Sequence, residues 1–208
     1  MGSSLSSYPL PHRPTKETSV EIEVIETEVP ELGSGVPRSE DTLHLTQITS
    51  DLAVQLGMFS KDTGFPLEKF ELGFAYEEAL ENAWADRINR LSNFDMVRPG
   101  EVELDGIYGS PDGISFPNGV TTLEEYKLTW YSMHSKKFLL DMPTWQWQTK
   151  GYCKMLNLTN CIFRVFWVNG DYRPPAPAYR AYSVKYTQEE IDQNWDNLKN
   201  HARDQGWL

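Results

Sequence analysis

The segment from Gly109 to Lys127 constrains the fold of this chain more than any other part of the sequence. A short strand-like run at 114–116 and a longer one at 122–130 are separated by Pro117-Asn118-Gly119. Asn and Gly tolerate the positive φ angles that tight hairpin turns require, so this tripeptide is a strong turn signal. The segment therefore predicts a β-hairpin.

Three charged side chains come together in this hairpin if its strands pair. Successive side chains of a strand alternate between its two faces, which puts Glu125 and Lys127 on one face. Glu124 and Tyr126 then lie on the other face. Asp112 begins the first strand and is expected near Glu125 and Lys127. Two carboxylates and an ammonium group in this arrangement suit a divalent metal ion and a water molecule to be activated.

The length and composition predict one folded domain over residues 41–208, preceded by an arm over residues 1–40. The arm is rich in Ser, Pro and Gly, and we expect it to be extended or partly disordered, with a strand-like alternation at Val20–Val29. No apolar run approaches the roughly 20 residues of a membrane span, and no secretory signal is visible. Cys153 and Cys161 are expected to fill core space in a reducing cytoplasm.

The net charge of −11 argues at first sight against a nucleic-acid partner, because neutralisation of phosphates supplies most non-specific affinity. The charge is unevenly distributed, however. Residues 42–125 hold 15 acidic and 5 basic side chains, whereas residues 126–208 hold 7 acidic and 11 basic ones. A bound cation would offset part of the central acidic charge, so a nucleic-acid partner stays open.

The hydrophobic pattern predicts an α/β fold with a central mixed β-sheet flanked by helices. Helices are expected at 41–59, 66–92, 145–156 and after Thr187, where Thr187-Gln188-Glu189-Glu190 forms a capping box. Ser39 or Asp41 is expected to cap the first helix, Gly57 to end it, and Thr144 to cap the third. Strands are expected at 102–107, 114–116, 122–130, 161–168 and 179–186.

Four motif pieces follow one another along residues 66–168. They are Gly73-Phe74-Ala75-Tyr76-Glu77-Glu78-Ala79, Ser110-Pro111-Asp112-Gly113, Glu124-Glu125-Tyr126-Lys127 and Gln148-Thr149-Lys150-Gly151-Tyr152. In this order, and on a helix, two strands and a helix, they resemble the PD-(D/E)XK nucleases. The likeness is greatest to the RecB-like and lambda-exonuclease (YqaJ-like) branch, from which Leu128-Thr129-Trp130 departs because relatives often carry Cys-Pro after the lysine.

The resemblance implies a metal site. Mg²⁺ or Mn²⁺ would be held by Glu77, Asp112, Glu125 and the backbone carbonyl of Tyr126, since these hard cations prefer oxygen ligands. Lys127 would orient the attacking water or stabilise the charge that develops on the phosphate. One metal ion and two both stay open. Some relatives hold a four-cysteine iron–sulfur cluster, which two cysteines cannot build, so no such cluster is expected.

The resemblance also implies a substrate. Gln148 would take a catalytic role in positioning the site, Tyr152 would contact the nucleic-acid backbone, and Ser110 and Lys150 would bind substrate. The implied activity is that of a metal-dependent deoxyribonuclease, most simply an exonuclease of the phage recombination or repair type, acting on single- or double-stranded DNA. Its setting would be a bacterial or phage-infected cytoplasm. Assembly of copies through the arm and a single-strand annealing or replication partner would fit such a role.

Other interpretations stay open. A structure-selective endonuclease or an RNA-directed nuclease could use the same fold, and a catalytically silent module that binds nucleic acid or protein would fit the acidic composition. Lys127 could be a simple salt-bridge partner of Glu125 or Asp112. The aromatic residues Trp130, Tyr131, Trp145 and Trp147 are expected to pack in the core more often than to stack on bases. No role is assigned to the scattered histidines, His12, His44, His134 and His201.

Overall fold

The structure is a computed structural model that describes residues 42–58, 72–73, 75–79, 82, 96–132, 142–170 and 177–208. The predicted arm at 1–40 lies outside the described residues, as do Asp41, His12 and His134. Within the described ranges, no helix combines the length and the apolar character that crossing a membrane requires.

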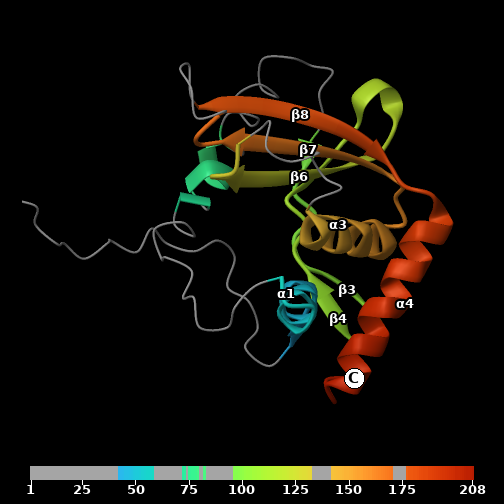
Figure 1. The fold of residues 1–208 in the computed structure, drawn as a ribbon. Helices are drawn as coiled ribbons and strands as arrows, with labels where there is room; N and C mark the ends of the chain where they lie inside the picture. The colour runs from blue at the N-terminus through green and yellow to red at the C-terminus, as the bar shows by residue number, and fades with distance from the viewer. Residues whose placement is uncertain are drawn as a thin grey trace, which may run out of the picture.

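A five-stranded sheet forms the centre of the fold, with its strands in the order β2-β5-β6-β7-β8 (Figure 1). The strands are β2 (Met96–Val97), β5 (Gly113–Ser115), β6 (Thr122–Thr129), β7 (Asn160–Trp167) and β8 (Ala178–Lys185). β6 and β7 run parallel, and the other neighbours are antiparallel. The sheet is therefore mixed, which confirms the predicted fold class.

The parallel pair β6–β7 explains where the core lies. Parallel neighbours need a crossover connection, and the chain between these two strands contains helix α3 (Pro143–Leu156). The helix covers the sheet face on which β7 places its alternate, fully buried side chains, Cys161, Phe163, Val165 and Trp167. The expectation that both cysteines fill core space is confirmed, since Cys153 on α3 is also buried and unbridged.

A second, three-stranded sheet lies outside the sequence prediction. Its strands, in the order β1-β4-β3, are β1 (Leu43–His44), β4 (Ile107–Gly109) and β3 (Val102–Leu104). The single strand expected at 102–107 is wrong because Asp105 and Gly106 have φ of 55° and 79° and turn the chain back in a two-residue hairpin. Trp195 Nε1 and Lys199 Nζ donate to Asp105 Oδ2 at 2.9 and 3.0 Å and so fix this turn.

The helices predicted at 41–59 and 145–156 both form, although two of the predicted caps are wrong. α1 spans Leu45–Gln55 and follows directly on β1, so His44 rather than Ser39 or Asp41 is its N-cap residue. α3 begins at Pro143, which lacks a backbone N–H and suits the first helical position, so Met142 replaces Thr144 as N-cap.

The remaining helix boundaries agree with the prediction. Gly57 follows the C-cap of α1 with a φ of 68°, which confirms it as the end of that helix. The capping box is confirmed at Thr187 and begins α4 (Gln188–Asp204). Of the helix expected at 66–92, the described residues 72–73, 75–79 and 82 are helical.

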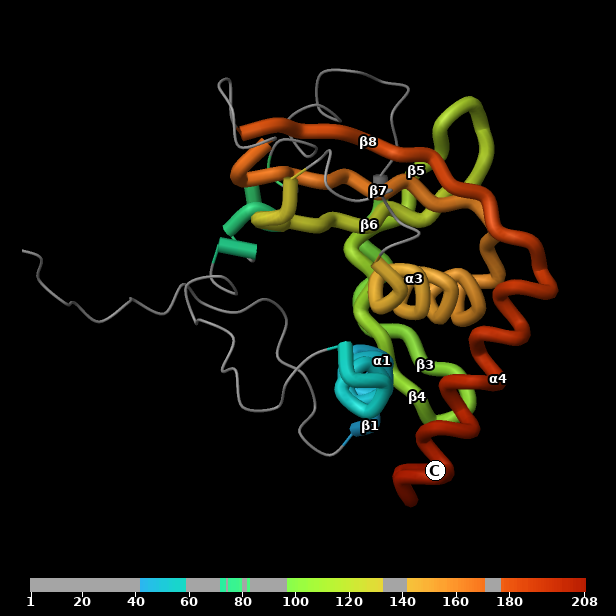
Figure 2. Tube along the Cα trace, in the orientation of Figure 1, coloured from blue at the N-terminus to red at the C-terminus, as the bar shows by residue number. Residues whose placement is uncertain are grey.

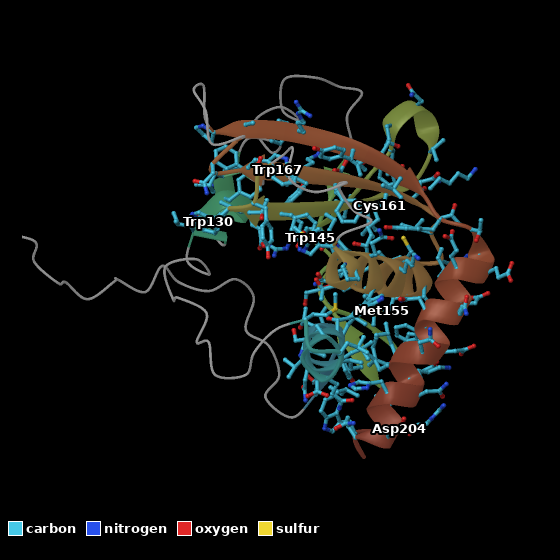
Figure 3. The ribbon with its side chains drawn as sticks, in the orientation of Figure 1. Trp130, Trp145, Met155, Cys161, Trp167 and Asp204 are labelled. Atoms are coloured by element: carbon cyan, nitrogen blue, oxygen red, sulfur yellow. The ribbon has the colours of Figure 1, made fainter. Side chains whose placement is uncertain are left out.

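The layers stack on α3. Figure 2 shows α3 between the five-stranded sheet and the layer of α1 with β3 and β4, while α4 runs along one side to the C-terminus. In Figure 3, Cys161 lies on the sheet side of α3 and Met155 on the side of α1. The side chains of Glu125 and Lys127 point from β6 into this layered interior, because they share a face with the fully buried Leu123.

Candidate active site

The β5–β6 hairpin forms as predicted, with a longer connection than a two-residue turn. Its antiparallel register is Gly113↔Glu124, Ile114↔Leu123 and Ser115↔Thr122. A short 3-10 turn at Pro117–Gly119 joins the strands, and Asn118 and Gly119 have φ of 55° and 77°. The positive φ angles signalled by Asn-Gly are therefore confirmed.

Asp112 reaches β6 from the residue that precedes β5. The register places it opposite Glu125, and its Oδ2 accepts a 2.6 Å hydrogen bond from the backbone N–H of Tyr126. Burial raises the pKa of the Asp112 carboxyl group above its ordinary range, while the positive charges of Lys127 and Arg98 act in the opposite direction. The sequence prediction that Asp112, Glu125 and Lys127 meet is thus confirmed.

Glu125 lies at the centre of this cluster. Its side chain is fully buried, and its Oε1 accepts a hydrogen bond from Lys127 Nζ. Oε2 of the same carboxylate is buried and has no hydrogen-bond donor among the described residues. The pKa of Glu125 is raised to about 8, chiefly by burial. The negative charges of Asp112 and Glu77 raise it further, whereas the positive charge of Lys127 lowers it.

Lys127 connects the hairpin to α3. Its Nζ donates to Gln148 Oε1 at 3.2 Å, and Gln148 Nε2 donates to Tyr152 Oη at 3.0 Å. Burial would lower the pKa of Lys127, but the carboxylates of Glu125 and Asp112 outweigh it and raise the pKa, so the ammonium stays charged. The motif residues of the hairpin and of α3 therefore form one chain of hydrogen bonds.

Tyr152 fits against β4 because that strand has a glycine at the point of contact. A Cβ atom on Gly109 would lie 2.7 Å from Tyr152 Cε1 and 3.0 Å from Met155 Sδ. Burial raises the pKa of the Tyr152 hydroxyl group, with Glu125 and Asp112 adding to the effect. The phenol therefore stays neutral and available as a hydrogen-bonding group near neutral pH.

Glu77 approaches the cluster from the helical residues 75–79. Its neighbour Tyr76 donates a 3.3 Å hydrogen bond to the carbonyl of Arg164, and the Tyr76 ring lies 5.4 Å from that of Phe166, so this segment lies beside β7. Glu77 is half-buried, and its charge contributes to the raised pKa of Glu125. Even so, no three Asp, Glu, His or Cys side chains within the described ranges converge closely enough to hold a metal ion.

Two further residues predicted for the site are Ser110, which precedes β5, and Lys150 on α3. Ser110 is half-buried in the link between β4 and β5, and Lys150 Nζ stands 5.1 Å from the ring centroid of Tyr186. Their roles in substrate binding stay predictions. Of the four aromatic residues, Trp145 and Trp147 are partly buried and pack against the core, as expected, while Tyr131 is 45% exposed.

The opposite face of β6 carries an ion pair that the sequence did not predict. Arg164 donates to both oxygens of the fully buried Glu124, through Nε at 2.7 Å and Nη2 at 3.0 Å. Ser115 Oγ donates to Glu124 Oε1 at 2.6 Å, and Arg164 Nη1 donates to Tyr179 Oη at 3.1 Å. The network therefore crosses four neighbouring strands directly behind Glu125.

Arg98 was also missed by the sequence analysis. It follows β2, which pairs with β5, and its side chain is exposed. β2 contains only Met96 and Val97, a run too short to be recognised as a strand from its pattern. The position of Arg98 beside the hairpin follows from tertiary pairing alone.

The motif pieces lie on the elements that the resemblance to PD-(D/E)XK nucleases implies: a helical segment, the start of β5, the middle of β6, and α3. The fold and the cluster define an α/β protein in which a fully buried carboxylate, a half-buried one and a lysine meet at two adjacent strands. No family model matches the sequence of this chain, and no curated protein matches it.

Several solved structures are similar in fold. One is the alkaline exonuclease LHK-Exo from Laribacter hongkongensis, also solved with dAMP, at 13% identity over 79% of this chain and 87% of that chain, with a TM-score of 0.47. A phage-related exonuclease from Haemophilus somnus 129PT has 12% identity over 76% and 79%, with a TM-score of 0.47. SSO0001 has 13% identity over 78% and 77%, with a TM-score of 0.46. The likeness concerns the fold alone.

Proposed function

We propose that this chain is a metal-dependent deoxyribonuclease, that it acts as an exonuclease of the phage recombination or repair type, and that its nuclease domain comprises residues 41–208. The observation that carries the proposal is the carboxylate of Glu125. It is fully buried beside Asp112 and Lys127, and its Oε2 has no hydrogen-bond donor in the described part of the chain. Leaving such an oxygen without a partner costs free energy, which a bound cation would recover.

The donor set fits Mg²⁺ or Mn²⁺. Asp112 and Glu125 are the carboxylates that would hold the ion, with Glu77 and the backbone carbonyl of Tyr126 as the further proposed ligands. When bound, the ion lowers the pKa of a water molecule and offsets negative charge on the scissile phosphate. The negative charges of Asp112 and Glu77 both act to raise the pKa of Glu125, and a divalent cation bound here would offset them.

The groups of the chain itself position the reactants. Lys127 Nζ donates to Glu125 and Gln148, so its ammonium group is held at the carboxylates. There it orients the water whose oxygen attacks phosphorus, and it donates to the phosphate oxygen that gains charge. Gln148 and Tyr152 hold the ammonium in place from α3. As the new bond to phosphorus forms, the attacking water gives up one proton to solvent; the bond from phosphorus to the leaving oxygen breaks, and that oxygen takes up a proton from solvent.

End-labelled linear DNA incubated beside a closed circle of the same sequence, with Mg²⁺ or Mn²⁺, tests this proposal. We expect the linear DNA to be shortened from its ends and the circle to stay intact. Lys127→Ala should abolish cleavage, whereas Lys185→Gln, which removes an exposed lysine at the end of β8, should leave it unchanged. Cleavage that is absent from wild type, or equal in wild type and Lys127→Ala, would sink the proposal.

Nicking of the circle would instead identify an endonuclease. The substrate panel should include single-stranded DNA, branched DNA and RNA, because the same fold could serve a structure-selective or an RNA-directed nuclease. Preferred cleavage of branched DNA would replace the exonuclease part of the proposal, and preferred cleavage of RNA would replace the DNA part; both would keep the site chemistry.

Two observations favour a second candidate, a catalytically silent module that binds nucleic acid or protein. Lys127 contacts Glu125 directly, and the described residues contain no group of three metal-binding side chains. Calorimetric titration with Mn²⁺ separates the candidates. A nuclease should bind the ion in a way that Asp112→Ala abolishes, whereas identical titrations of wild type and Asp112→Ala would favour the silent module.

A further inference from the structure

The tip of the β5–β6 hairpin, residues 116–120, holds two large apolar side chains in solvent. Phe116, which follows β5, is 41% exposed, and Val120, which follows the 3-10 turn, is 48% exposed. In Figures 1 and 2 this yellow-green segment projects from the body of the molecule. Two exposed apolar side chains on one projecting turn form a surface that a ligand can reach.

The hairpin tip is held rigid by its own hydrogen bonds. The N–H of Gly119 donates to the carbonyl of Phe116 at 3.1 Å, and the N–H of Val120 donates to the carbonyl of Pro117 at 3.1 Å. Thr122 Oγ1 donates to the carbonyl of Val120 at 3.0 Å. The position of the Phe116 backbone is thus set in advance, so a contact made here costs little conformational entropy.

The hairpin tip also lacks charge. None of the 11 residues from Gly113 to Leu123 is acidic or basic, although the chain as a whole carries a net charge of −11. Such a surface neither repels a polyanion nor gains affinity by neutralising phosphates. Its affinity has to come from contact with a flat or apolar group, and the face of a nucleobase is such a group.

The size of the hairpin tip favours a nucleobase over a protein. Full burial of one aromatic side chain covers roughly 150–250 Å², whereas a specific protein interface buries about 800 Å² on each partner. Phe116 and Val120 together fall well short of that area. A nucleobase, in contrast, needs only one aromatic ring on which to stack.

The distance to the carboxylates fits the same occupant. Thr122 begins β6 just after the hairpin tip, and Glu125 lies three residues further along that strand, which is roughly 10 Å. A DNA strand advances about 3.4 Å per nucleotide in a duplex. A strand with one phosphate at Glu125 can therefore present a base to the hairpin tip roughly two to four nucleotides away.

We propose that Phe116 is a substrate-binding residue, whose ring stacks on an unpaired nucleobase roughly two to four nucleotides from the phosphate at Asp112 and Glu125. This inference rests on the proposed nuclease function and extends it by naming the form of DNA that the hairpin tip holds. The base must be unpaired, because the face of a base inside a duplex is covered by its neighbours. Stacking does not read the edge of the base, so the contact is independent of sequence.

The test removes the ring from the protein and the base from the DNA, separately and together. The ligands are a short fluorescein-labelled single strand and a series of the same strand in which each position in turn is abasic. Anisotropy with Mg²⁺ gives each affinity, and the parent chain and all variants carry Lys127→Ala to prevent cleavage. Leu56→Ala is the matched control, because it removes an apolar side chain that is 61% exposed at the end of α1, away from the hairpin.

We expect Phe116→Ala to weaken binding about tenfold, and one abasic position to weaken binding of the parent chain by the same factor. The strand that is abasic at this position should bind the parent chain and Phe116→Ala equally, because both changes remove the same stack. The slope of log K against log salt, between about 50 and 200 mM, should not change, since no charge is lost.

Two further measurements separate stacking from damage to the fold. Phe116→Ala should melt close to the parent chain, because a substitution at an exposed position has little effect on stability. Phe116→Trp should bind at least as tightly as the parent chain, since the indole ring offers a larger face. Binding by Phe116→Trp as weak as that of Phe116→Ala would overturn the inference.

The outcomes also separate this inference from the proposed function. If wild type cleaves DNA while Phe116→Ala matches Leu56→Ala on every strand, the inference is overturned and the proposed function stands. A loss in Phe116→Ala that is the same on all strands, with no abasic position coupled to it, would overturn the inference as well, because the contact would then not be to a base. A wild-type chain that neither binds nor cleaves DNA would overturn the proposed function together with the inference.

Discussion

The backbone N–H of Tyr126 donates a 2.6 Å hydrogen bond to Oδ2 of Asp112, which lies 14 residues earlier in the chain. The bond joins the start of β5 to the middle of β6 and so fixes the aspartate beside Glu125. Hydrogen bonds to an ionised acceptor are among the stronger ones in proteins. Asp112 therefore has a structural role, through this hydrogen bond, and a proposed chemical role, as a metal ligand. Two variants separate these roles.

Asp112→Asn should keep the structural role and lose the chemical role. The asparagine oxygen can still accept from Tyr126, so we expect a melting temperature close to that of wild type, while cleavage falls on the order of 100-fold or more because a metal-binding charge is lost. Asp112→Ala should in addition lose roughly 1.5–3 kcal/mol of stability with the hydrogen bond. Asp192→Asn is the control for both assays, because it alters a partly exposed aspartate of α4 that pairs with Lys154 of α3. Equal stability of the two Asp112 variants would contradict the structural role of the hydrogen bond.

Glu125 should make the metal-free protein less stable as the pH rises. Its pKa in the folded state is about 8, against an ordinary value of 4.5, chiefly because of burial. A carboxyl group with a raised folded pKa contributes its full stability below the unfolded pKa and loses that contribution as the pH rises through the folded pKa. The window for this loss therefore runs from about pH 4.5 to about pH 8.

Glu125→Gln removes this titration. We expect its free energy of unfolding, relative to wild type, to increase by at least about 1 kcal/mol between pH 5 and pH 8, or a relative gain of roughly 2–4 °C in melting temperature. Thermal unfolding in a chelator at several pH values measures the difference. Saturating Mn²⁺ should reverse the order at pH 8, because wild type alone gains stability from the ion. A difference between the two proteins that stays constant with pH would refute the titration.

Local patterns predicted most of the site. Alternation along β6 was enough to place Glu125 and Lys127 on one face, and the Asn-Gly turn signal was enough to bring Asp112 beside them. Helical spacing placed Gln148 and Tyr152 one turn apart, where they form a hydrogen bond in the structure. Each of these inferences needs only neighbours in sequence.

The missed features depend on contacts between distant residues. The partner of Glu124 is Arg164, 40 residues later on β7, and nothing in either local pattern indicates a buried ion pair. Asp105-Gly106 was a readable turn signal, but the small sheet it belongs to also needs β1, which contains only two residues. The caps of α1 and α3 were displaced by tertiary context and by Pro143, which begins α3 one residue before Thr144.

The ion pair behind the site should contribute strongly to stability. Glu124 is fully buried, and within the described residues Arg164→Met would leave its charge with the hydrogen bond from Ser115 alone. Removing one partner of a buried pair costs about 3–5 kcal/mol, so we expect a loss of this size in urea unfolding. The double variant Glu124→Gln with Arg164→Met should recover part of that loss, because no uncompensated charge stays buried. A double variant no more stable than Arg164→Met alone would show that packing of the arginine matters more than its charge.

Gly109 tests whether the position of Tyr152 controls activity. A methyl group at Gly109 would lie 2.7 Å from Tyr152 Cε1, so Gly109→Ala should displace the ring and, through Gln148, the ammonium group of Lys127. We expect a loss of about 1–3 kcal/mol in stability from overpacking. We also expect cleavage to fall on the order of 10-fold or more through kcat, because the reacting groups lose their alignment.

Gly151→Ala is the matched control for this prediction. Its new methyl group would lie 2.6 Å from Leu45 Cδ2, so it overpacks the contact between α3 and α1 while leaving the Tyr152 ring its space at Gly109. Both variants should lose stability, and only Gly109→Ala should lose kcat well beyond that loss when both are assayed far below their melting temperatures. If the two variants show equal kcat at equal stability, the hydrogen bonds from Tyr152 through Gln148 to Lys127 support the fold without setting the geometry of the reaction.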